Sequence, residues 1–195
     1  AEKEFSLLEK IFDKEKGRPA CPECKAEVVK PEGEVMYYCS NAACPAQVQQ
    51  RLEHFTSRGA MDIRGIGESM SAILLKEGLV KDVADLYYLK KEQLISLERM
   101  ADKSANNIIK AIDDSKETPL PRVIFALGIL HVGEEMAELL AQHFGSIDYD
   151  NPNSLANASR ERLMSIPTIG PKIADSIIAF FRQEENKKII QRLKD

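Results

Sequence analysis

Four cysteines near the start of the chain have the spacing of metal ligands. They are Cys21, Cys24, Cys39 and Cys44, which gives the pattern C-x2-C-x14-C-x4-C. Zinc takes four soft ligands at the corners of a tetrahedron, and two close pairs of thiolates on tight turns supply them. Because four thiolates leave the ion no open position, the pattern predicts a structural zinc ion and not a catalytic one. Disulfides would require an oxidising compartment, for which the sequence gives no sign.

The elements that hold these cysteines follow from the residues around them. A Pro-Glu-Gly turn signal at positions 31–33 has apolar residues on both sides, so we expect a β-hairpin that brings the two cysteine pairs together. After it, Val48, Leu52 and Phe55 recur at i, i+4 and i+7, which predicts one face of a helix. We therefore expect a zinc-finger module over residues 19–58.

The leader before this module, residues 1–18, carries Phe5, Leu8 and Phe12 at helical spacing, which is consistent with a short amphipathic helix. Its N-terminal sequence AEKEFSLLEK is charged throughout, so no signal peptide is evident. The chain has no run approaching the roughly 20 apolar residues of a membrane span, and we expect no membrane partner.

Charge and composition limit the ways in which the chain can bind a partner. Of its 195 residues, 44% are apolar and 30% are charged, and the net charge is −4. This balance argues against wholesale electrostatic binding to nucleic acid, but it allows local phosphate contacts made by backbone amides. Apolar residues recur mostly at helical spacing, so we expect a mainly α protein.

A second kind of chemistry comes from glycines at the start of helices. The stretch MDIRGIGESMSAILL, residues 61–75, has Gly65, Ile66 and Gly67 at the mouth of an apolar helix. Alone, such a pair fits a bound phosphate and a tight turn between core helices equally well. The stretch recurs three more times, however, at spacings of 34, 32 and 37 residues. The residues in the place of Gly67 are Ala101, Gly133 and Gly170.

Four units on one template predict a repeat architecture. Each unit keeps an apolar residue before the reference position, a small residue four later and an aliphatic residue seven later. Helical solenoids such as tetratricopeptide repeats share this period, but they do not need glycine where the second helix begins. The pattern resembles the helix-hairpin-helix motif, h-x-G-h-G followed by a helix.

The chemistry of that motif depends on backbone amides. Without a Cβ, the hairpin backbone can come close to a phosphate. Free N–H groups at the start of the following helix point at the phosphate oxygens, and the helix dipole favours their charge. Contacts of this kind are independent of base sequence and need few lysines.

The copies are unequal. Only the first keeps both glycines, and bulky residues in place of these two should weaken binding without unfolding the protein. The second, with Arg99 and Ala101, is expected to be degenerate and structural. Lys103 and Lys172 fall early in the following helices, where each either reaches a phosphate or is a solvated side chain. The candidate DNA-binding residues are Gly65, Ile66, Gly67, Ser69, Lys103, Ser104, His131, Val132, Gly133, Thr168, Ile169, Gly170 and Lys172.

Two breaks organise the helical part, residues 59–195. The charged, proline-bearing segment 113–122 separates the first two copies from the last two, and 145–154 is a loop between copies three and four. Pairs of hairpins suit duplex DNA, since a pair can hold both strands across the minor groove. The expected fold is mainly α: a small four-cysteine zinc finger with a β-hairpin, followed by an all-α domain of four helix-hairpin-helix repeats.

These features together resemble the bacterial NAD-dependent DNA ligases. RLEHFTSRGAMDIRGIGES at 51–69, CSNAACPAQ at 39–47 and ALGILHVGE at 126–134 look like segments of that family, as does the order of cysteines and hairpins over 19–195. The resemblance implies a role in sealing nicks during replication and repair. The helix-hairpin-helix domain would grip the minor-groove backbone, and the zinc module would connect it to an oligonucleotide-binding fold.

The catalytic part of that family does not match. Family catalysis uses a nucleophilic lysine in K-x-D-G, and the sequence contains no Asp-Gly dipeptide. We therefore expect that the segment alone is not an enzyme and that NAD acts only through domains absent from it. The implied partners are nicked double-stranded DNA and the adenylation and oligonucleotide-binding domains of a parent ligase, in the bacterial cytoplasm at the nucleoid. The alternatives are a zinc-capped helical protein-interaction scaffold and a DNA-binding module of another repair enzyme.

Overall fold

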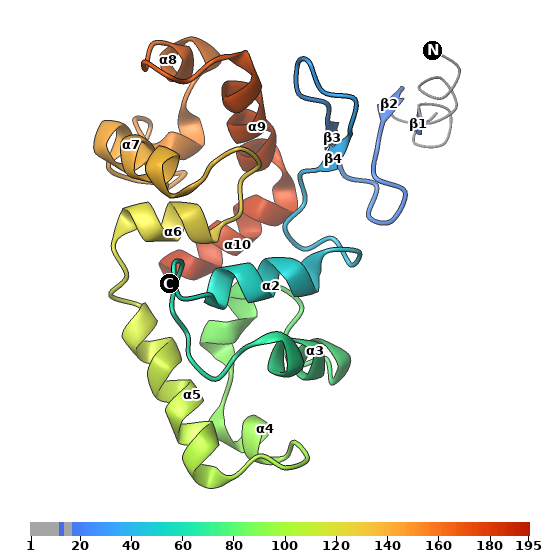
Figure 1. Cartoon of the computed structure of the whole chain (residues 1–195), viewed down its shortest axis with the longest axis vertical. Helices are drawn as coiled ribbons and strands as arrows, with labels where there is room; N and C mark the ends of the chain where they lie inside the picture. Colours follow the sequence, from blue (N-terminus) through green and yellow to red (C-terminus); the bar gives the residue numbers. More distant parts are fainter. Residues whose placement is uncertain (1–11, 14–16) are drawn as a thin grey trace.

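The computed structural model describes residues 12–13 and 17–195. Most of the leader lies outside the described residues. Of the three residues on which a helix was expected there, only Phe12 is described, and it lies in a strand. At its end, Phe12–Asp13 (β1) pairs antiparallel with Arg18–Pro19 (β2). Figure 1 shows an elongated helical body with the strands at one side of it.

The hairpin expected between the cysteine pairs is present. Val28–Val29 (β3) pairs antiparallel with Tyr38–Cys39 (β4). In the connecting loop Gly33 has a φ of 81°, a left-handed conformation that glycine adopts without steric cost. The pairing brings the Sγ atom of Cys39 within 3.5 Å of that of Cys24, so this small sheet assembles the cysteine cluster.

The rest of the described chain is helical. Its helices pack in pairs, α2 with α3, α4 with α5, α6 with α7 and α8 with α9, and this arrangement after a zinc-finger hairpin confirms the expected fold class. The α-helices span Val48–Thr56 (α2), Glu68–Lys76 (α3), Lys91–Ile95 (α4), Asp102–Ser115 (α5), Leu120–Ala126 (α6), Glu134–Phe144 (α7), Arg160–Met164 (α8), Pro171–Arg182 (α9) and Glu184–Lys194 (α10). Two 3-10 helices, Val83–Tyr88 (η1) and Leu155–Asn157 (η2), lie between pairs.

The repeat template marks the positions that hold each pair together. The small residues four places after the reference position are fully buried, which lets the two helices approach closely. They are Ser71, Ala105, Ala137 and Ala174. The aliphatic residues three places further on are buried as well: Leu74, Ile108, Leu140 and Ile177. Both positions on the second helix of each unit therefore face the core. The hairpin that connects the two helices lies at the surface.

Helix α2 serves two parts of the fold. It follows the zinc-finger hairpin directly, and it is also the first helix of the first unit, where it packs against α3, α6 and η1. Leu52 and Phe55, on the face predicted from the sequence, are both 0% exposed. The helix that follows the zinc-finger hairpin is therefore anchored in the core of the first unit.

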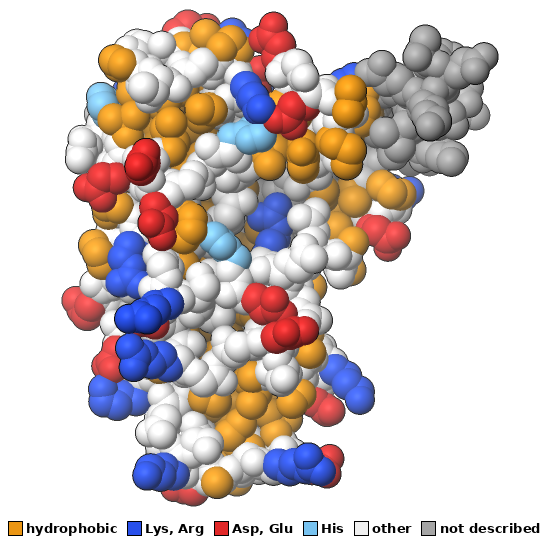
Figure 2. Space-filling model, viewed as in Figure 1, with side chains coloured by type: hydrophobic (Ala, Val, Ile, Leu, Met, Phe, Trp, Pro, Cys, Tyr) orange, Lys and Arg blue, Asp and Glu red, His pale blue; other side chains and the backbone are white. Residues whose placement is uncertain are grey.

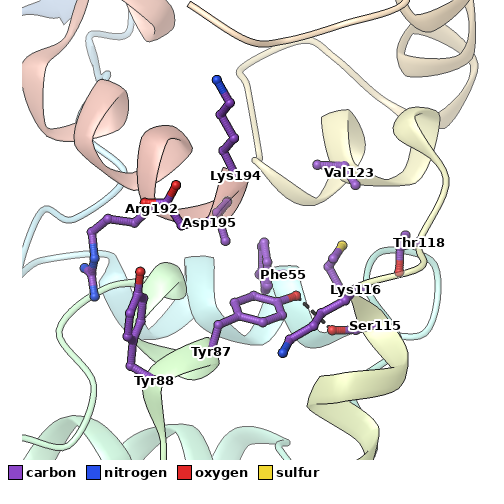
Figure 3. A pocket seen from close by; sticks show the side chains of 12 residues that line it. Phe55, Tyr87, Tyr88, Ser115, Lys116, Thr118, Val123, Arg192, Lys194 and Asp195 are labelled. Carbon is purple, nitrogen blue, oxygen red and sulfur yellow. Dashed lines mark hydrogen bonds between the residues drawn. The ribbon is translucent and has the colours of Figure 1, made fainter.

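Helix α10 runs back along the molecule after the last unit. In Figure 1, α2 and α10 cross the middle, between a lower half with α3 to α5 and an upper half with α6 to α9. Beside the end of α10 a cavity of about 410 Å³ remains, where the Tyr87 and Ser115 hydroxyl oxygens are 2.8 Å apart (Figure 3). In the described ranges, no helix combines the length and the hydropathy needed to cross a membrane.

Candidate metal centre and nucleic-acid interface

The four cysteines come together as the spacing predicts. Cys21 and Cys24 lie on the turn before β3, Cys39 ends β4, and Cys44 lies on the turn before α2. Zn–S bonds of about 2.3 Å put the sulfur atoms of a tetrahedral site roughly 3.8 Å apart. Here the four Sγ atoms lie within 4.8 Å of one another, with Cys21 and Cys44 separated by 3.9 Å. The four thiols therefore fit a zinc ion.

The thiols differ in how readily they give up a proton. Burial raises the pKa of Cys39 well above its usual value, and it raises the pKa of Cys44 to about 11. Burial also raises the pKa of Cys24, but hydrogen bonds from Ala26 and Asn41 outweigh it and bring that pKa below its usual value. Since the thiolate is the ligand, a metal must displace protons from the buried thiols.

The four hairpins share one backbone conformation, which the unequal sequences did not predict. The residue two places before the reference position has a positive φ in every unit, and the second unit does not differ in this respect. These residues are Gly65 (95°), Arg99 (64°), His131 (66°) and Thr168 (78°). A non-glycine residue in this region costs on the order of 1 kcal/mol and persists only where the surroundings enforce it.

Each hairpin then opens into a helix whose first turn is uncapped. The N-cap residues Gly67, Ala101, Gly133 and Gly170 are extended, and within the described chain no side chain caps any of them. A Cβ on any of the three glycines would meet no described atom within 4 Å. Packing does not require glycine there, and in the described residues no side chain satisfies the amides of the first turn.

In the first, third and fourth hairpins the apolar residue before the N-cap anchors the turn. Ile66, Val132 and Ile169 are only 4%, 6% and 4% exposed, so their side chains belong to the core. Any contact that these predicted DNA-binding residues make with a phosphate must come from the backbone. Ser69, Lys103 and Ser104, by contrast, are exposed on the first turns of α3 and α5.

Gly65 corrects one expectation. A Cβ on this residue would lie 2.8 Å from Cγ1 of Ile108, and its φ of 95° disfavours any side chain. The expectation that a bulky residue at position 65 leaves the fold intact is therefore wrong. Gly67 has neither constraint, so it is the position at which binding can be tested without disturbing packing.

Lys172 does not project freely from α9. Its Nζ atom makes an ion pair with the carboxylate of Glu34, in the loop between β3 and β4. Nε2 of His131 lies 3.3 Å from Oε1 of the same carboxylate, although the angles there do not make a hydrogen bond. Two predicted DNA-binding residues from different hairpins thus meet one acidic side chain that sequence reasoning did not single out.

Comparisons with known proteins agree with both halves of the site. The NAD-dependent DNA ligase C4 zinc finger domain matches residues 20–46, a SAM-like helix-hairpin-helix tandem matches 58–114, and a helix-hairpin-helix motif matches 122–190. A protein named DNA ligase from Dehalococcoides mccartyi is 56% identical over 98% of the chain. Proteins of the same name from Desulforudis audaxviator and Geobacter sulfurreducens are 50% and 49% identical over 89% and 96% of it.

The chain is a zinc-finger and helix-hairpin-helix segment of the NAD-dependent DNA ligase family. It spans 28% of the length of the relatives from Dehalococcoides and Geobacter and 25% of the one from Desulforudis. The family match and the clustered cysteines suggest zinc binding, and the hairpin motifs suggest DNA binding.

The ligase segment also has basic residues that the sequence analysis missed. Arg58 and Arg64 lie with Gly65 and Gly67 around a shallow hollow at the first hairpin. Arg122 is close by, with Nη2 2.8 Å from the carbonyl oxygen of Arg58. Figure 2 shows Lys and Arg side chains gathered over the connection between α5 and α6. The available signal was the presence of two arginines, Arg58 and Arg64, within the loop of the first hairpin.

Proposed function

We propose that this segment binds duplex DNA through the sugar–phosphate backbone at the minor groove, without regard to base sequence. It does so as the non-catalytic part of an NAD-dependent DNA ligase that seals nicks in replication and repair. The observation that carries the proposal is the common conformation of the four hairpins, each with uncapped amides at an exposed helix start. Amides in this position bind phosphate oxygens, and the helix dipole adds to the attraction.

The glycines at the N-cap positions support this function, because the packing of the protein itself does not require glycine there. Gly67, Gly133 and Gly170 have ordinary φ values and space in front of them, so another residue would fit the protein itself. A phosphate that approaches the amides would fill that space. The predicted contacts at Ile66, Val132 and Ile169 are then amide contacts, while Ser69, Lys103, Ser104 and Thr168 add side-chain donors.

The zinc ion has a structural role in this proposal. Cys21, Cys24, Cys39 and Cys44 hold it, and it fixes the turns at both ends of the β3–β4 hairpin. NAD acts only through the adenylation domain of the parent ligase, which is a partner of this segment together with the oligonucleotide-binding domain. The substrate is nicked double-stranded DNA at the bacterial nucleoid.

The test is a titration of fluorescent duplex DNA with the zinc-loaded segment at several salt concentrations. We expect a negative slope of log affinity against log salt, about −0.9 for each phosphate that a cationic side chain neutralises. Gly67→Val should weaken binding about ten-fold, because it blocks charge-assisted hydrogen bonds from the amides. Absence of binding by the unaltered segment at low salt would refute the proposal.

The matched control is Gln183→Val. It puts the same side chain at the N-cap of α10, a helix start that belongs to none of the hairpins. This variant should bind DNA like the unaltered segment, and both variants should keep their melting temperature. Equal losses in the two variants would show that the effect is not specific to the hairpin.

A further inference from the structure

The loop between β3 and β4 ends against the third and fourth hairpins, and Glu34 makes the contact. Its carboxylate pairs with Lys172 of α9, lies 3.3 Å from Nε2 of His131, and hydrogen-bonds with the side chain of Tyr38. The Glu34 side chain is 22% exposed. The hydrogen bond from Lys172 lowers the pKa of Glu34, so the carboxylate is charged at neutral pH. An oxyanion thus already lies between these two hairpins.

The groups around this carboxylate are those expected to hold a DNA phosphate. Lys172 is the second residue of α9, directly after the first-turn Pro171 and the uncapped N-cap Gly170, where the helix dipole favours negative charge. His131 is the left-handed residue of the third hairpin. Its Nε2 atom is buried beside the Glu34 carboxylate and makes no hydrogen bond in the described structure.

The first two hairpins differ from this arrangement. Lys103 occupies in the second hairpin the place that Lys172 occupies in the fourth, two residues after the N-cap. Lys103 is exposed, and in the described part of the chain it has no acidic partner within ion-pair distance. The contact with Glu34 is therefore a property of the upper half of the molecule and not of the repeat.

The tip of the loop that carries Glu34 makes few contacts that would hold it against the third and fourth hairpins. Val35 and Met36, which follow Glu34, are 71% and 56% exposed. Gly33, which precedes it, lies in open space, since a Cβ added there would meet no described atom within 4 Å. Little apolar contact would be lost if this tip moved away, and an ion pair near the surface adds little to hold it in place.

We propose that Glu34 occupies the phosphate position between the third and fourth hairpins in the DNA-free protein and is displaced when DNA binds. The zinc-finger loop then acts as an internal competitor for the upper half of the interface. The first two hairpins are open to DNA at once, whereas the last two accept it only after the loop moves. This inference rests on the proposed DNA binding.

The experiment compares duplex affinities of four zinc-loaded proteins at one salt concentration: the unaltered segment, Glu34→Gln, Glu32→Gln and the double variant Glu34→Gln with Lys172→Met. Glu32→Gln is the matched control, because it removes the same charge from an exposed residue of the same loop. We expect Glu34→Gln to bind about five-fold more tightly than Glu32→Gln. The gain should disappear in the double variant, because Lys172 is then no longer present to bind the phosphate.

Other outcomes separate this inference from the function on which it rests. If the unaltered segment binds DNA but Glu34→Gln binds no more tightly than Glu32→Gln, the role of Glu34 is only structural and the inference is overturned. If none of the four proteins binds, the proposed function fails and the inference with it. Glu34→Ser, measured alongside, tests the same release with a shorter side chain. Zinc content and melting temperature confirm that each variant is folded.

Discussion

Arg51 places a partly buried guanidinium between the cysteine cluster and the third hairpin. Its Nη2 and Nη1 atoms lie 3.4 Å from the carbonyl oxygens of Cys39 and Gly128. Burial lowers the pKa of Arg51, and the charges of Cys39 and Cys44 act in the opposite direction. A zinc ion with four thiolates has a net charge of about −2. The cation therefore stabilises the loaded centre and connects it to the hairpin.

Replacing Arg51 should weaken zinc binding. Arg51→Met keeps most of the length of the side chain but removes its charge and its hydrogen bonds. We expect about a ten-fold loss of zinc affinity, as is usual when a group next to a metal site is removed. Competition with a chromophoric chelator measures it, with Arg64→Met as control because that side chain is 81% exposed. Equal affinities of the two variants would contradict the role given to Arg51.

At the scale of the elements, the sequence predicted where helices pair but not how the hairpins are shaped. The small and aliphatic positions of the template are visible in the sequence because each has to face a neighbouring helix. The left-handed residues are hidden, because Arg99, His131 and Thr168 do not have the side chain that such a conformation favours. There the packing of the two helices decides the backbone, against local preference.

The cysteine site was predictable for a different reason. Its ligands lie within a short stretch of chain, so their spacing alone restricts the geometry. The contacts of Glu34 and Arg51 join that stretch to the third and fourth units, far along the sequence. Such contacts depend on how whole elements are placed in the fold, so a local sequence pattern cannot predict them. The same holds for α10, which the repeat template does not include.

Removing zinc should unfold one element and spare the others. Strands of two residues cannot persist alone, so the β3–β4 hairpin depends on the metal. After chelation we expect fast amide exchange over residues 21–44, while the paired helices keep their protection and the far-ultraviolet circular dichroism changes little. Hydrogen-exchange mass spectrometry measures this, and added zinc should restore protection. Loss of the whole helical signal would show that the metal supports the entire fold instead.

At the scale of the whole molecule, α10 holds together parts that are distant in sequence. Asn186 is fully buried and joins this helix to the zinc module: its Oδ1 accepts from the amide of Ala42 at 2.8 Å, and its Nδ2 donates to the carbonyl oxygen of Ser40 at 2.6 Å. Near its end, Arg192 reaches η1 in the other half of the molecule. The helix thus fixes the two pairs of hairpins relative to each other.

The contact between Arg192 and η1 predicts a pH-dependent stability. Nη2 of Arg192 lies 2.5 Å from Asp85, and Nη1 lies 3.3 Å from Asp82. Burial raises the pKa of Asp85, but the hydrogen bond from Arg192 outweighs it and lowers that pKa. Asp85 therefore stabilises the fold above the pKa of an unfolded aspartate, about 3.9, and this contribution is lost as pH falls through its lower folded value.

Arg192→Gln should reverse that dependence. Without the cation the carboxylates repel each other, so their folded pKa values rise and their charged forms become unfavourable. We expect a free energy of unfolding about 1 kcal/mol lower than in the unaltered segment at pH 7, a modest loss because Arg192 is 36% exposed. The difference should shrink toward about pH 3, as pH falls through the lowered folded pKa of Asp85 and this carboxylate becomes protonated in the unaltered protein as well. Urea unfolding at both pH values measures it, and a difference independent of pH would mean that Arg192 acts through its packing on Tyr88 instead.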